Sequence, residues 1–244
     1  CVPRYPMFPT EFLSVATAAP STLATAQASA RVYCDLAAGR PVEVFAATVL
    51  SRSGASDIAW TAEDVIAGLK EQMHSSFGPN LLCDTVGGGI ENVGMSRAVS
   101  EMLLSAPSGQ YIEVFPFWPK AEPAAFGGLM AKGGFRLWAN YTANSGVSSP
   151  VRLKSVAGAP AVLLNPWPGQ NASVVVRGDS DTSSDSVQSV SVTWVQTPAG
   201  LALKFDTAAG ENKTYIITKS GSVLASPSGD RIASHHGGSQ QDIA

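Results

Sequence analysis

The sequence of 244 residues has few charged side chains, few cysteines and no long apolar run. Only 14% of the residues are charged, the net charge is −3, and no basic stripe is present. This composition excludes a surface that attracts nucleic acid or an anionic membrane. The longest apolar runs, such as Pro160–Leu164, are far shorter than the roughly 20 residues of a membrane span. We therefore expect neither nucleic acid nor a membrane as a partner.

Cysteine is present only at Cys1, Cys34 and Cys83, with no CxxC spacing and no accompanying histidine. This pattern argues against a zinc site, and no metal or cofactor is predicted. An odd number leaves two arrangements open, one disulfide with a free thiol or three free thiols.

The chain starts with Cys1-Val2-Pro3-Arg4, which has neither an initiator methionine nor a charged segment ahead of an apolar core. Either a leader has been removed or the sequence begins inside a longer protein. We expect the second, so that an upstream part of the same polypeptide becomes a partner of this chain.

Alanine-rich amphipathic segments dominate the sequence before residue 110. In the clearest of them, Thr61 can cap a helix together with Asp64, three residues on. Val65, Leu69 and Met73 then recur every four residues, which predicts one buried helix face. Helices are predicted at Leu23–Leu36, Pro41–Ser51, Thr61–Phe77 and Val93–Leu104.

After residue 110 the hydrophobic period becomes two, which is typical of strands with one buried face. The spacing of these strands predicts an antiparallel sandwich. The polar stretch Gly178–Asp185 is interpreted as a solvated hairpin loop and residues 226–244 as a disordered tail. Strands are predicted at Tyr111–Phe115, Phe135–Tyr141, Val151–Val156, Ala161–Leu164, Ser173–Arg177, Val187–Val195, Leu201–Phe205 and Tyr215–Thr218.

The sequence Gly87-Gly-Gly-Ile-Glu91-Asn92 stands out directly before the last of the predicted helices. Consecutive glycines allow positive φ and a close approach to a ligand. One interpretation is a helix start, with Asn92 as the cap and Glu91 paired with the helix dipole. The other is a sugar site, because a carboxylate and a carboxamide suit vicinal hydroxyls and a glutamate can activate water. An inverting glycosidase also needs a second carboxylic acid, and none is evident in this chain.

The stretch GGGIEN-x-G, a helix ending in EMLL and the turn Glu113–Lys120 together resemble the late catalytic region of glycoside hydrolase family 95. Leu129–Phe135 occupies the place of a Gly-rich turn in that family. Phe8–Phe12, Pro79-Asn80 and Asn165–Pro168 resemble further pieces of a subgroup that carries GGGIEN. The members include α-L-fucosidases and α-L-galactosidases. The similarity extends over residues 5–220 and is specific between 79 and 168.

The resemblance implies a fold and a division into domains. The chain would be an α+β multidomain fragment, with the last helices of an (α/α)6 barrel followed by an antiparallel β-sandwich. Residues 1–109 would complete a helical barrel, residues 110–225 would form the sandwich, and residues 226–244 would be the tail.

The resemblance also implies roles for single residues. Glu91 falls at the position of the family's base carboxylate, and Asn92 matches the asparagine of that loop. The general acid and the asparagines that hold water would lie upstream of Cys1. Arg97 would reach substrate or pair with Glu91, with a surface role as the alternative. Trp118 would stack on a sugar, with packing between helices and sheet as the alternative.

We therefore expect the C-terminal part of a glycoside hydrolase that hydrolyses glycosidic bonds in oligo- or polysaccharides with inversion of configuration. The alternative is a non-catalytic remnant that binds glycans or proteins. Glycosylation acceptor triplets begin at Asn140, Asn171 and Asn212, and they favour a secreted protein.

Overall fold

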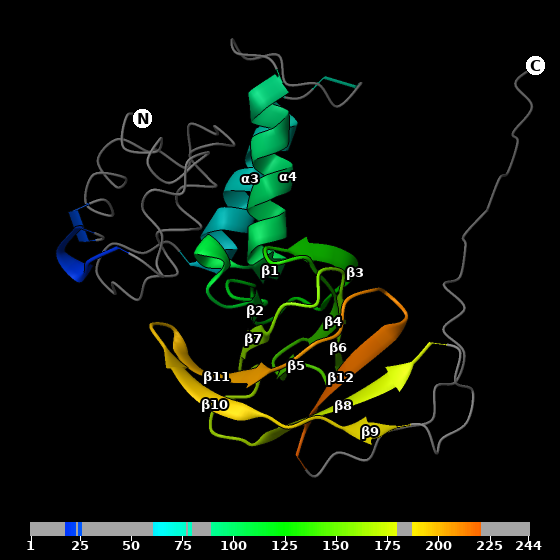
Figure 1. Cartoon of the computed structure of the whole chain (residues 1–244). Coiled ribbons are helices and arrows are strands. Elements are labelled where there is room, and N and C mark those ends of the chain that lie inside the picture. Colours follow the sequence, from blue (N-terminus) through cyan, green and yellow to red (C-terminus); the bar gives the residue numbers. More distant parts are fainter. Residues whose placement is uncertain are drawn as a thin grey trace, which may run out of the picture.

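The computed structural model describes residues 18–22, 24–25, 61–76, 78–79, 89–179 and 187–220. Two helices stand together at one end of a set of antiparallel sheets (Figure 1). Residues 20–22 and 24–25 are helical as well. Among the helices in these ranges, none combines the length and the apolar character that a membrane span requires.

Helix α3 (Ala62–Ser76) begins where its sequence predicts, because Thr61 caps it. The Asp64 backbone N–H donates to Thr61 Oγ1 at 3.1 Å, and the Thr61 backbone N–H donates to Asp64 Oδ2 at 2.9 Å. These reciprocal bonds satisfy two amide groups that a helix start otherwise leaves open. The capping prediction is therefore confirmed.

Helix α4 (Gly89–Leu103) packs against α3 in a small apolar cluster. The cluster joins the first half of α3 to the second half of α4. Its buried members are Ala62, Val65, Leu69, Ala98 and Met102. The predicted third member of the α3 stripe, Met73, is 48% exposed and lies one turn past Leu69, the last α3 residue among the described members of this cluster.

Helix α4 runs directly into strand β1 (Leu104–Ser105), which pairs with β2 (Glu113–Val114). The short 3-10 helix η2 (Pro107–Gly109) turns the chain between them. The Ile112 backbone continues this path onto β7, since its N–H donates to Val162 O at 2.7 Å. The helix pair is thus connected to the sheets without a linker.

Two larger antiparallel sheets follow, with strand orders β10-β11-β7 and β3-β4-β6-β12-β8-β9, and β5 pairs with β4. The period-two segments therefore form antiparallel strands. Their bounds are β3 (Ala124–Ala131), β4 (Phe135–Thr142), β5 (Gly146–Val147), β6 (Val151–Ser155), β7 (Ala161–Leu164), β8 (Ala172–Gly178), β9 (Gln188–Ser189), β10 (Thr193–Thr197), β11 (Gly200–Phe205) and β12 (Lys213–Lys219).

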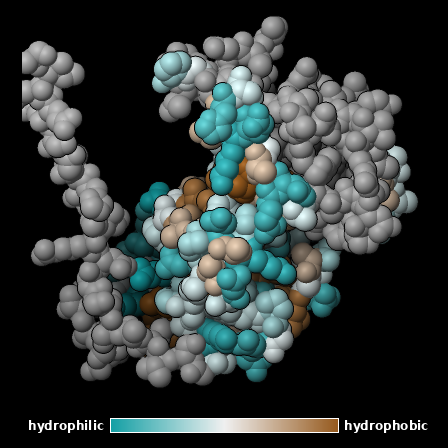
Figure 2. Space-filling model, turned by 180° about the vertical axis from the view of Figure 1, so that it is seen from behind, coloured by the Kyte–Doolittle hydropathy of each residue, from teal (hydrophilic) through white to brown (hydrophobic). Residues whose placement is uncertain are grey.

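Both sheets contribute to one apolar core. Leu163 and Leu203 come from the smaller sheet, and Leu137, Leu153 and Ile217 come from the larger. All five are fully buried. Apolar surface on the face shown in Figure 2 is broken into separate patches by hydrophilic residues, as expected once the alternating side chains of each strand are buried on one face.

The predicted fold class, with the last helices of an (α/α)6 barrel, is wrong. The described residues form mostly antiparallel sheet, and they contain no set of barrel helices. The periodicity of apolar residues indicates that a segment is helical, but it does not indicate how many other helices pack against it. Here the buried stripes of α3 and α4 face each other and the aromatic residues Phe117 and Trp118.

Several predicted features lie outside the described residues. They are the helix at Pro41–Ser51, nearly all of that at Leu23–Leu36, the cysteines at 1, 34 and 83, residues 180–186 of the polar loop and the tail from 226.

Candidate functional site

The backbone of Glu91 and Asn92 lies in the first turn of α4. The helix begins at Gly89, so Asn92 is inside the helix rather than at its cap. Of the Gly87–Asn92 stretch, the structure describes the backbone from Gly89 onward. The open amide groups and the dipole of a helix start favour a negative side chain in this turn.

Arg97 lies two turns further along α4 and pairs with Glu101. Arg97 Nη2 is 2.5 Å from Glu101 Oε1, and the Arg97 side chain is 41% exposed. Glu101 also accepts a 2.6 Å hydrogen bond from Ser105 Oγ. Glu101 is buried, with 8% of its surface exposed, and the polar contacts from Arg97 through Glu101 to Ser105 link α4 to the end of β1.

Trp118 lies where the helices meet the sheets. It is half-buried and packs against both apolar clusters. Its indole N–H donates to Glu122 O at 3.0 Å, which closes the Pro116–Lys120 turn. This environment matches the packing alternative for Trp118.

Phe115 fixes the start of that turn. Its φ of 49° is in the left-handed region, which a bulky residue rarely adopts. Its ring lies 5.3 Å from the rings of both Phe126 and Tyr141, and 6.4 Å from that of Trp118. These ring contacts pack the start of the turn that carries Trp118 against β3 and β4.

The four predicted site residues fall into two groups along α4. Glu91 and Asn92 are at its start, whereas Trp118 packs on the cluster formed by Ala98 and Met102. At 1.5 Å per residue, Ala98 and Met102 lie about 10 and 16 Å from Glu91 along the helix axis. Arg97 is between them and is engaged with Glu101. The part of α4 that Trp118 packs against is therefore about two to three helical turns from the backbone of Glu91.

A groove on the smaller sheet was not predicted from the sequence. Its volume is about 260 Å³. One wall is the turn after β7, and the other is the end of the β10–β11 hairpin. The lining residues are Leu164, Asn165, Pro168, Gly169, Gln170, Asn171, Trp194, Ala199, Gly200 and Leu201. The signal in the sequence is the Asn165-Pro-Trp-Pro turn together with its polar continuation Gly169-Gln170-Asn171.

Hydrogen bonds hold both walls of the groove. Asn165 Nδ2 donates to Gln170 O at 2.8 Å, and Asn165 Oδ1 accepts from the Trp167 N–H at 3.1 Å. The Asn165 backbone N–H donates to Leu201 O at 2.9 Å and so ties the two walls together. On the far wall, Thr197 Oγ1 donates to Gly200 O at 2.8 Å. The groove is therefore preformed.

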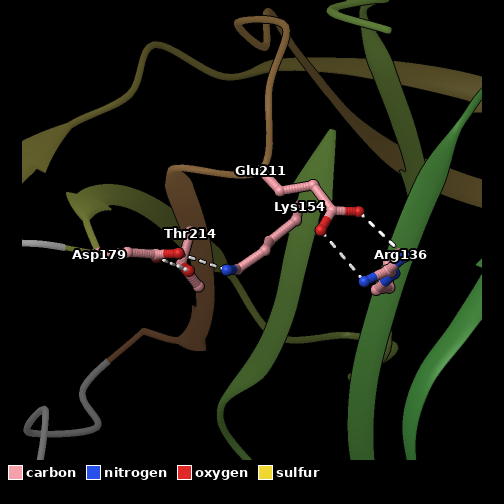
Figure 3. Close-up of polar contacts among 5 residues, drawn as sticks. All are labelled: Arg136, Lys154, Asp179, Glu211 and Thr214. Atoms are coloured by element: carbon pink, nitrogen blue, oxygen red, sulfur yellow. Dashed lines mark hydrogen bonds and ion pairs between the residues drawn. The ribbon is translucent and has the colours of Figure 1, made fainter. Parts of the chain in front are cut away.

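Arg136 of β4 and Lys154 of β6 pair with carboxylates just outside the strands of the larger sheet (Figure 3). Arg136 binds Glu211 through two nitrogens, at 3.1 and 3.0 Å. Lys154 donates to Asp179, which also accepts from Thr214 Oγ1 at 2.8 Å. Burial raises the pKa of Asp179, but the bonds from Lys154 and Thr214 and the Lys154 charge outweigh it and hold the pKa below its ordinary value.

Within the described ranges, no group of three or more histidine, cysteine, aspartate or glutamate side chains is arranged to hold a metal ion.

Comparison with known proteins gives little guidance. No family model matches the chain, and no curated protein matches it. Among solved structures, the catalytic domain of GH30 xylanase C from Talaromyces cellulolyticus matches with 12% sequence identity and a TM-score of 0.25. The match covers 40% of this chain and 20% of that one, so the chain spans about a fifth of that structure. A TM-score of this size does not establish a shared fold.

Proposed function

We propose that this chain is part of a glycoside hydrolase that resembles family 95. It hydrolyses its substrate with inversion of the anomeric configuration, and Glu91 is the base that activates water. The observation that carries the proposal is the position of Glu91 in the first turn of α4, two residues after the last of three glycines. Glycines permit a substrate to approach the backbone, and the helix start favours an ionised carboxylate.

The rest of the proposed mechanism needs groups from elsewhere in the polypeptide. A water molecule activated by Glu91 would attack the anomeric carbon while a carboxylic acid protonates the leaving oxygen on the opposite face. We propose that an upstream segment supplies this acid, and that Asn92 binds a sugar hydroxyl. Arg97 would then support the site indirectly, through the Glu101 pair that fixes the second half of α4.

The test is Glu91→Gln in the full polypeptide that contains this chain. Aryl α-L-fucosides and α-L-galactosides serve as substrates, and NMR of the first product identifies its anomer. Turnover should fall about 10²–10⁴-fold, because a general base contributes that much. The matched control is Glu63→Gln, which removes an exposed carboxylate from the first turn of α3 and should leave turnover unchanged. Equal turnover in both variants would contradict the role of Glu91.

The second candidate is a non-catalytic module that binds glycans. The groove beside Trp194 favours it, because its lining is neutral and carries exposed amide groups. The variant Glu91→Gln distinguishes the two candidates. It abolishes hydrolysis if the chain belongs to a glycoside hydrolase, and it leaves glycan binding intact if the chain is a non-catalytic module.

We also propose that the protein is secreted. The asparagines of the two acceptor triplets that lie outside the groove, Asn140 and Asn212, are exposed, as glycosylation requires. Expression through a secretory host, followed by glycosidase treatment, should lower the apparent mass. No change in mass together with retention inside the cell would contradict secretion.

A further inference from the structure

We propose that the groove between the turn after β7 and the end of the β10–β11 hairpin binds one neutral sugar ring of a glycan. This inference is independent of Glu91 and stands or falls separately from hydrolysis. It assigns a binding site to the smaller sheet, on the half of the molecule that the proposed catalytic residues do not use.

The chemistry of the lining identifies the ligand class. All ten lining residues are uncharged, so the groove offers no ion pair to a phosphate, a nucleotide or an acidic peptide. It offers a tryptophan ring and a leucine side chain on one side. On the other side it offers the carboxamides of Gln170 and Asn171, both exposed. Apolar C–H faces and hydroxyl groups are the two features that a pyranose presents together, and this lining complements both.

The position of Trp194 explains why its ring is available. Trp194 pairs with Leu203 across β10 and β11, so it shares the core-facing side of the smaller sheet. It lies on the edge strand and remains half-buried, packed against the core along one side. Leu201, two residues before Leu203 on the same face, is 47% exposed. Trp194 and Leu201 therefore give the groove an apolar surface at the edge of the core.

The size and rigidity of the groove fit a single ring. A volume of about 260 Å³ lies just below the roughly 300–1,000 Å³ of pockets for drug-sized ligands. Both walls are fixed by hydrogen bonds through Asn165 and Thr197. A preformed site avoids the entropic cost of ordering its loops on binding. A single neutral ring with about a dozen heavy atoms should bind with a Kd of roughly 1 mM.

The experiment is an NMR titration of the full chain with a panel of methyl glycosides. The panel contains methyl α-L-fucopyranoside, methyl β-D-galactopyranoside, methyl β-D-xylopyranoside and methyl α-D-mannopyranoside. We expect at least one to shift the Trp194 indole resonance and the amides of Gln170 and Asn171, with saturation. Shifts confined to other parts of the chain, or no saturable shift with any glycoside, would overturn the proposal. A shift of the Trp194 indole with peptides instead of glycosides would also overturn it.

Variants of the lining residues test the groove. Gln170→Ala with Asn171→Ala removes two exposed carboxamides, and Leu201→Arg places a charged side chain in the groove. Each should weaken binding at least tenfold. Trp194→Phe retains packing on the core and should weaken binding less than Leu201→Arg.

The matched controls are Trp138→Phe, which alters a half-buried tryptophan on β4 of the other sheet, and Gln188→Ala, which removes an exposed carboxamide on β9. Neither should change the Kd. Unchanged binding in Leu201→Arg, with the fold intact by its NMR spectrum, would refute the site. Hydrolysis measured in the same variant of the full polypeptide separates this result from the fate of Glu91.

Discussion

Arg97 Nη2 lies 2.5 Å from Glu101 Oε1, so a buried carboxylate in α4 is neutralised by a guanidinium one helical turn earlier. The two residues differ in exposure, since Arg97 is 41% exposed at its side chain and Glu101 is 10% exposed at its own. Removing the buried carboxylate and removing the exposed guanidinium should therefore lower the free energy of unfolding by different amounts.

Arg97→Met should destabilise the fold more than Glu101→Gln. The first change leaves a buried carboxylate without the charge of Arg97, at a cost of roughly 1–3 kcal/mol. The second leaves a cation that water can solvate. Urea unfolding of both variants gives the two free energies. If Glu101→Gln lowers the free energy of unfolding more than Arg97→Met does, Arg97 is not the main partner of the carboxylate.

Trp118 should prove to be a packing residue first. Trp118→Ala removes a ring that joins both apolar clusters and should lower the free energy of unfolding by about 2–4 kcal/mol. Trp118→Phe retains a ring but removes the donor to Glu122 O, and should cost about 1 kcal/mol. If Trp118 contacts substrate, Trp118→Phe will change KM for a glycoside by more than its effect on unfolding explains.

Asp179 should make stability depend on pH in the acid range. Its pKa is lowered in the folded state, so its contribution is present above its unfolded pKa and disappears as pH falls through the folded value. Asp179→Asn should therefore cost about 0.2–1 kcal/mol at neutral pH, as for other exposed ion pairs. The difference from the unaltered protein should shrink below about pH 4. Asp206→Asn, at another exposed position, is the control.

Two glycines with similar φ should respond differently to alanine. Gly146 (φ +85°) has open space where a Cβ would lie, whereas a Cβ on Gly158 (φ +75°) would be 2.7 Å from the Ala209 backbone nitrogen. Gly146→Ala should cost about 1–2 kcal/mol, from backbone strain. Gly158→Ala should cost roughly 1–3 kcal/mol more, because backbone must also move. Equal melting temperatures would show that the Gly158 turn is not tightly packed.

Local signals in the sequence gave the local structure. The Thr61 cap depends on side chains three residues apart, and the strand at Phe135–Thr142 on strict alternation. Arrangement in space depends on distant partners, and there the predictions for the helices failed. Met73 has the right spacing for burial but the wrong position along α3. The barrel came from a resemblance, and no local pattern could have corrected it.

The candidate site shows the same division. The glycine-rich stretch drew attention to Glu91, but the separation of Glu91 from Trp118 follows from the length of α4 and the place of its apolar cluster. The groove depends on a turn and a hairpin that are some 30 residues apart in the sequence, so their meeting could not be read from spacing.

Helix α4 ends at Leu103 and β1 begins at Leu104, while the Phe115 N–H donates to Leu103 O at 2.7 Å. The last residue of α4 is thus hydrogen-bonded to the residue that follows β2. A sideways push on the start of α4 would be carried as torque into the β1–β2 ladder, with the helix as a lever about 20 Å long. Small shifts of the sheet would in turn be magnified at the turn that holds Glu91.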